Sequence, residues 1–184
     1  MTTTERIEIP LSKTKLTRGL IGSVVFVLIG LWILIYQPAI SNSVFINPLI
    51  KYGAAIACIL FFGFVSIFYA KKLTDKKPGL IIDNTGITDN SSAVSVGHTP
   101  WTDIKYITTI KVVKQDFIIL IVENPNNYIN KQTNIIKRKT MEMNFKSYGS
   151  PINISANSLK SNFNELKSVL DNKLAEFKSK KPMT

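Results

Sequence analysis

Basic side chains in one polar segment are the residues of this 184-residue chain whose type and spacing most favour binding. Lys137, Arg138 and Lys139 are consecutive, and Lys131 and Lys146 flank them. Ammonium and guanidinium groups in such a patch can bind the phosphate oxygens of anionic lipids or the carboxylates of an acidic protein surface. The alternative interpretation is a solvated helix face. The sequence leaves both interpretations open.

The residue types that enzymes use as nucleophiles, bases and metal ligands are scarce. The chain has one histidine, His98, and one cysteine, Cys58, so neither a histidine-based triad nor a Cys/His metal site is expected within one chain. His98 is expected in a turn, either exposed to solvent or with local hydrogen bonds, and Cys58 is expected in a packing role. Ser12 and Lys15 match the S-x-x-K pattern but lack its companion signatures. We therefore expect a protein that is not an enzyme and has no cofactor and no metal site.

Two long apolar runs lie in the first 70 residues. Residues 19–36 carry no charge, and residues 48–70 carry one, Lys51, near their start. A helix over the first run would rise about 27 Å, close to the thickness of a bilayer core. We expect a transmembrane helical hairpin over residues 19–70. The alternatives are buried helices, which the remaining chain is too short to cover, and a cleaved signal peptide, whose apolar run is normally shorter.

Small residues in the two runs predict how the hairpin packs. Gly30 is expected opposite Ala54 and Ala55, and Gly22 and Gly63 are expected to allow close approach nearer the other end. Neither run has an Asp, Glu, Arg or His at its centre, which argues against an ion or proton path.

Basic residues flank the two runs on one side only. Four precede the first run and four follow the second, whereas the loop of residues 37–47 has none. They are Arg6, Lys13, Lys15, Arg18, Lys71, Lys72, Lys76 and Lys77. The positive-inside rule therefore predicts that both termini are cytoplasmic. This placement explains most of the net charge of +11, and nucleic acid is not an expected partner because no zinc or RNP-like pattern occurs.

The N-terminal arm, residues 1–18, has the alternation of a half-buried strand. Ile7, Ile9 and Leu11 recur at every second position, so this strand could fold back on the C-terminal domain. Pro10 restricts such a strand to a sheet edge, because proline cannot donate to the ladder.

Residues 71–78 form a basic linker, and residues 79–184 have the pattern of a mainly β domain with added helices. Strands are predicted at residues 80–82, from Ile87 after a turn at 83–86, and at 93–97, 104–113, 117–122 and 151–155, with a turn at Lys114, Gln115 and Asp116. Short strands joined by tight turns favour an antiparallel sheet.

Two segments of this domain are predicted to be helical. Residues 124–148 read as one or two inserted helices, with Asn124 as N-cap and Gly149 as C-cap. Their helical spacing comes from Tyr128, Ile129, Gln132, Ile135, Ile136 and Met143. A closing helix follows Asn162 and Glu165, with an apolar stripe of Phe163, Leu166, Leu170, Leu174 and Phe177.

The order of these segments resembles that of bacterial pleckstrin-homology-like domains. The similarity lies in GLIIDNTGIT, in PWTDI, in the following hairpin and in a last strand that runs into an amphipathic helix. The whole chain is similar to small inner-membrane proteins in which two spans precede such a domain; the shared stretches are IEIPLSKTKL, DNSSAVSVG and PINISANSL. The resemblance implies two nearly orthogonal antiparallel sheets in a barrel or sandwich, with a helix plugging one end, and no catalytic residues. The insertion at residues 124–150 departs from a minimal domain.

These observations predict a membrane-anchored α+β protein of the bacterial cytoplasmic membrane, with two spans and a cytoplasmic PH-like domain. We expect a non-catalytic interaction domain that recruits a protein, a second copy of itself or anionic lipid. Trp101 is expected to support the core. The alternative is an accessory subunit of a membrane transport or envelope-maintenance complex that acts through its transmembrane helices.

Overall fold

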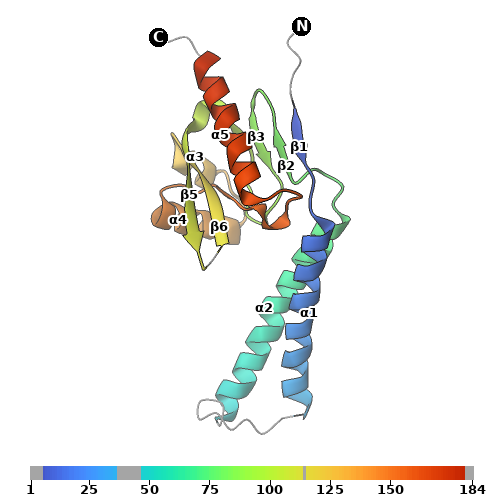
Figure 1. Cartoon of the computed structure of the whole chain (residues 1–184). Coiled ribbons are helices and arrows are strands. Elements are labelled where there is room, and N and C mark those ends of the chain that lie inside the picture. The colour runs from blue at the N-terminus through green and yellow to red at the C-terminus, as the bar shows by residue number, and fades with distance from the viewer. Residues whose placement is uncertain (1–5, 37–46, 114, 181–184) are drawn as a thin grey trace. The chain divides into compact units, whose positions relative to one another are not determined.

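The computed structural model describes residues 6–36, 47–113 and 115–180 (Figure 1). The chain divides into two compact units. The helical unit is Lys13–Lys76, and the sheet unit combines Met1–Ser12 with Lys77–Thr184. The predicted N-terminal arm is thus divided between the two units. Most of the predicted loop at residues 37–47 lies outside the described residues.

The helical unit consists of α1 (Lys13–Tyr36) and α2 (Pro48–Thr74). Both helices are long and apolar enough to cross a membrane, and both extend beyond the predicted runs into the basic flanking segments. Asn47 starts α2: its Oδ1 accepts a 3.0 Å hydrogen bond from the Leu49 N–H, and Pro48 occupies the first turn, where no backbone donor is needed.

The two helices pack in antiparallel fashion along one narrow seam. Along α1, Ser23 Oγ accepts a 2.8 Å hydrogen bond from the Ser66 hydroxyl, and the Phe26 ring stacks on Phe62 with centroids 4.4 Å apart. A Cβ added to Gly30 would lie 3.1 Å from the backbone oxygen of Ala55, so the predicted contact between these two small residues is confirmed. Small side chains allow this close approach of two backbones.

The predicted role of Gly22 and Gly63 in this packing is wrong. A Cβ on either glycine would meet no atom within 4 Å. The seam on α1 runs through positions 19, 23, 26 and 30, and the helical period of 3.6 residues turns position 22 away from it. Gly19, which the sequence analysis did not single out, is close to the other helix instead. A Cβ at this position would lie 2.4 Å from the Tyr69 ring.

The first sheet of the sheet unit has four antiparallel strands in the order β1-β2-β3-β4. They are β1 (Ile7–Ile9), β2 (Leu80–Ile82), β3 (Gly86–Asp89) and β4 (Gly97–Pro100). Ile9 pairs with Leu80, which confirms that the arm folds back on the domain. β1 lies at the edge of the sheet and ends just before Pro10, as the missing N–H of proline requires.

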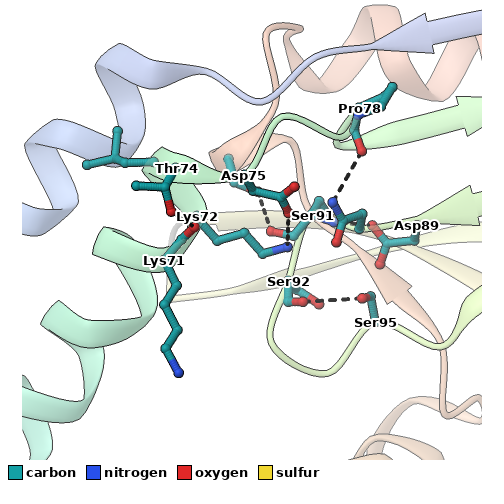
Figure 2. A network of polar contacts seen from close by, with 12 residues as sticks. Lys71, Lys72, Thr74, Asp75, Pro78, Asp89, Ser91, Ser92 and Ser95 are labelled. Carbon is teal, nitrogen blue, oxygen red and sulfur yellow. Dashed lines mark hydrogen bonds and ion pairs between the residues drawn. The ribbon is translucent and has the colours of Figure 1, made fainter.

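The strand predicted at residues 93–97 is wrong, because residues 90–96 form a loop and β4 begins at Gly97. Short polar side chains hold this loop: Asp89 Oδ1 accepts a 2.8 Å hydrogen bond from the Ser91 N–H, and Ser95 Oγ donates to the Ser92 carbonyl (Figure 2). Such bonds give the backbone an alternative to a strand ladder. The hydrogen bonds that serine and aspartate side chains make with the backbone therefore determine the structure of this segment, rather than its alternating apolar residues.

The second sheet has three antiparallel strands in the order β5-β6-β7. They are β5 (Ile104–Val112), β6 (Gln115–Val122) and β7 (Asn153–Ile154). The predicted positions of these strands are confirmed, although β6 begins at Gln115, which was predicted as part of a turn; Lys114 lies outside the described residues. A single 3-10 turn, Trp101–Asp103, connects β4 to β5 and buries Trp101, which is 2% exposed, in the core as expected.

Three helices complete the sheet unit (Figure 1). α3 (Pro125–Asn130) and α4 (Ile135–Tyr148) are inserted between β6 and β7, so the insertion contains two helices. α5 (Phe163–Lys180) closes the chain and buries three leucines of the predicted stripe: Leu166, Leu170 and Leu174. The layout of antiparallel sheets with helices confirms the α+β class. The Asn162 side chain caps α5 as predicted, accepting a 2.9 Å hydrogen bond from the Glu165 N–H.

Segments far apart in sequence meet where the sheet unit connects to the helices. Leu11 bridges Leu159 in antiparallel fashion, and the Ser12 N–H donates a 2.8 Å hydrogen bond to the Ser158 carbonyl. Ser158 Oγ in turn donates to the Ser91 carbonyl at 2.7 Å. A Cβ on Gly79 would lie 2.4 Å from the Leu159 side chain, so glycine is needed at this crossing. Residues from three separate segments of the chain thus meet here: Leu11 and Ser12, Ser91, and Ser158 and Leu159.

Candidate functional site

Helix α4 carries most of the basic residues that the sequence singles out, and its two ends are well defined. Asn134 Oδ1 accepts a 3.0 Å hydrogen bond from the Lys137 N–H at the start of the helix. At its end, Gly149 adopts the left-handed conformation (φ 77°) and its N–H donates to the Phe145 carbonyl. The local sequence therefore determines both the position and the length of this helix.

One apolar and one basic side chain of α4 contact the rest of the sheet unit. Met141 is completely buried in the core of the sheet unit. Lys137 is half-buried, and its Nζ donates a 2.7 Å hydrogen bond to the backbone carbonyl of Ser95, in the loop before β4. This ammonium group therefore attaches α4 to a neighbouring loop, a role that no sequence pattern indicated.

The five predicted binding residues do not form one uniform patch. Lys131 caps the end of α3 through its backbone, and Lys137 bonds Ser95 as described above. Arg138 Nε pairs with the carboxylate of Glu142 at 3.1 Å, one turn further along α4. Lys139 and Lys146 are exposed, and no acidic side chain among the described residues pairs with either of them.

Exposed apolar side chains accompany Lys139 and Lys146 on the outward side of α4. Ile135, Ile136 and Met143 are 70%, 68% and 68% exposed. The steps from Ile135 to Lys139, from Lys139 to Met143 and from Met143 to Lys146 are four, four and three residues, which places these side chains next to one another on a helix. We call Ile135, Ile136, Lys139, Met143 and Lys146 the outer face of α4.

Helical spacing predicted α4 correctly, but three of the apolar residues that produced the spacing point to solvent. The core is instead contacted by Met141, which the sequence pattern did not include. One signal was available: Ile136 and Met143 are seven residues apart, as are Lys139 and Lys146, so the two pairs follow parallel lines along the helix. Neighbouring lines of apolar and basic residues differ from the purely apolar stripe of a core helix.

A second polar cluster of the sheet unit is structural. The Tyr128 hydroxyl donates a 2.6 Å hydrogen bond to Asp103 Oδ2 and so holds α3 against the 3-10 turn. Burial, together with the hydrogen bond to the Asp103 carboxylate and its charge, raises the pKa of Tyr128 well above its usual value. The phenol therefore stays protonated and acts as a donor rather than a base.

The remaining candidates for chemistry are dispersed. His98 lies in β4 rather than in a turn, and its Nδ1 is 3.0 Å from Thr88 Oγ1, so the expected local hydrogen bond is present. Cys58 lies within α2, with Sγ 3.4 Å from the Phe26 carbonyl. Within the part of the chain that the structure describes, no three His, Cys, Asp or Glu side chains come together in a way that could hold a metal ion.

Comparison of the chain with protein-family models, with curated proteins and with solved structures found no match. The resemblance to pleckstrin-homology-like membrane proteins therefore stays a prediction.

Proposed function

We propose that this chain is an integral protein of the bacterial cytoplasmic membrane, anchored by α1 and α2, whose sheet unit is a non-catalytic interaction module. One observation carries the proposal: the two helices touch only along a narrow seam and expose large apolar side chains elsewhere. Leu60, Phe61 and Phe64 are 69%, 62% and 63% exposed. Lipid is the environment that such surfaces fit, since water would leave them unfavourably hydrated.

The distribution of charge supports a cytoplasmic position for both termini. Basic residues lie before and within the first turns of α1 and in the last turn of α2, which includes Lys71 and Lys72. The polar loop between the helices has no lysine or arginine. Positively charged flanks stay on the cytoplasmic side, so the sheet unit, which is joined to both flanks, lies there as well.

A PH-like arrangement for the sheet unit is part of the proposal. A four-stranded and a three-stranded antiparallel sheet share one core, and α5 contributes Leu166, Leu170 and Leu174 to it. An amphipathic helix packed on two sheets in this way supports a barrel or sandwich closed by its last helix. The inserted pair, α3 and α4, adds a surface that a minimal domain lacks.

The proposed activity is binding rather than catalysis. Partners in keeping with the surface are a protein, a second copy of the chain or anionic lipid. The outer face of α4 is the proposed docking surface, because apolar side chains are exposed there beside lysines that an acidic or anionic partner can contact.

Two measurements on the full chain test this proposal. Membranes from cells that express it are extracted with alkaline carbonate, and a reporter that is fluorescent only in the cytoplasm is fused to the C-terminus. We expect the protein to stay in the membrane pellet and the reporter to fluoresce. Release into the supernatant contradicts the anchor, and a dark but intact fusion contradicts the orientation.

A further inference from the structure

The outer face of α4 exposes both apolar and basic side chains. Ile135, Ile136 and Met143 expose about two thirds or more of their surface, at 70%, 68% and 68%. Lys139 and Lys146 stand among them and are exposed as well. Apolar side chains beside basic ones suit the headgroup region of an anionic membrane, where the apolar groups leave water and the ammonium groups contact phosphates.

The charge of the helix is complementary to an anionic surface. α4 contains four basic residues and one acidic residue, Glu142, which pairs with Arg138. Lys137 is directed inward to Ser95, so the ammonium groups left for an external ligand are those of Lys139 and Lys146. They lie two helical turns apart, far enough to contact two separate headgroup phosphates.

The covalent connection keeps such a surface close to a membrane once α1 and α2 are anchored. α2 ends at Thr74 and β2 begins at Leu80, so a short segment separates the last turn of the helix from the sheet. Short tethers raise the effective concentration of one binding partner near the other to the millimolar range. A face that binds lipid only weakly on its own is therefore sufficient for docking.

We infer that the outer face of α4 docks on the anionic cytoplasmic leaflet, with Ile135, Ile136 and Met143 inserted between headgroups and with Lys139 and Lys146 bound to lipid phosphates. This inference rests on the proposed function, because it requires the membrane anchor. It assigns the partner of the sheet unit as a lipid surface. Docking also holds the sheet unit in one orientation on the membrane, which limits the surfaces that it presents to the cytoplasm.

The test uses the full chain with Cys58 replaced by Ala, carrying one new cysteine with an environment-sensitive fluorophore. Three positions are compared in lipid nanodiscs: Met143→Cys on the outer face, Ser168→Cys on the exposed side of α5, and Phe64→Cys on the apolar surface of α2. Each is measured in phosphatidylcholine and in phosphatidylcholine mixed with phosphatidylglycerol, with and without a lipid-borne quencher.

We expect the label at position 143 to shift to the blue and to be quenched in the anionic discs but not in phosphatidylcholine alone. The label at position 168 should remain in an aqueous environment in both kinds of disc. Lys139→Ser together with Lys146→Ser should weaken docking about 25-fold, since each lysine near an anionic surface contributes about a fivefold preference. Lys111→Ser with Lys160→Ser removes the same charge from exposed positions elsewhere and should leave docking unchanged.

Other outcomes overturn the inference. If the label at position 143 stays in an aqueous environment in both kinds of disc, lipid is excluded as the partner, and a protein becomes the expected partner of this face. Equal quenching in both lipids excludes recognition of anionic headgroups, and so does docking that high salt fails to reverse. The label at position 64 separates the two proposals: if it is not quenched, the membrane anchor itself is wrong.

Discussion

The indole Nε1 of Trp101 donates a 2.7 Å hydrogen bond to the backbone carbonyl of Asp83. Trp101 begins the 3-10 turn after β4, and Asp83 begins the turn between β2 and β3, so one bond connects two turns at the same end of the first sheet. The Asp83 side chain organises its own turn, accepting hydrogen bonds from the N–H groups of Thr85 (2.8 Å) and Gly86 (3.2 Å). The ring itself is buried in the core.

Trp101→Phe should destabilise the sheet unit by about 2–4 kcal/mol. The change removes the hydrogen-bond donor of a carbonyl and leaves a cavity where the larger ring was. Denaturant unfolding of the full chain in detergent, followed by protease susceptibility, measures this loss. Tyr106→Phe serves as the control, because that ring is 55% exposed, and it should change stability by less than about 0.5 kcal/mol.

Asp83 should make the stability of the sheet unit depend on acid pH. Partial burial works to raise its pKa, but the hydrogen bonds from Thr85 and Gly86 outweigh it and hold the pKa of this carboxyl below its usual value. A lowered native pKa means that the stabilisation is complete above the unfolded pKa, near 4, and is lost as the pH falls through the native pKa.

The stability difference between the wild type and Asp83→Asn should therefore be largest near neutral pH and should shrink as the pH falls below about 4. Unfolding curves between neutral pH and acid measure it. Asp116→Asn, at the exposed start of β6, makes the same chemical change away from this turn. A difference for Asp83→Asn that stays constant across this range would contradict the linkage.

Gly30→Ala should weaken the contact between α1 and α2, whereas Gly22→Ala should not. The new Cβ at position 30 would lie 2.7 Å from the Ile59 side chain and 3.1 Å from the Ala55 backbone oxygen, whereas at position 22 it meets open space. Overpacking of this kind costs about 1–3 kcal/mol. Unfolding of the helical pair in detergent compares the two variants, and equal effects would contradict the observed seam.

Lys137→Ser should destabilise the sheet unit by about 1–2 kcal/mol, because it removes the charged donor that bonds the Ser95 carbonyl. Lys139→Ser, two positions further along α4, should leave stability almost unchanged, since that side chain is exposed. Thermal unfolding of the two variants measures the difference. If both variants lose the same stability, the distinction between the inner and outer sides of α4 is wrong.

Local patterns in the sequence are sufficient to locate most elements of this protein. The two apolar runs, the Asp83 turn with its flanking strands, and the Asn162 cap of α5 each depend on residues close together in the chain. Periodicity, turn residues and capping side chains act over a few positions, so their signals survive without any knowledge of the fold.

Tertiary structure decided which of these elements meet and which of their sides face inward. The pairing of Ile9 with Leu80 joins strands on either side of the two helices, and no local pattern specifies that partner. Met141, rather than Ile136 or Met143, reaches the core because the side of α4 that is covered depends on what packs against it. A helical period shows that a helix forms, but the burial of a given side chain is a property of its neighbours, which only the folded chain brings together.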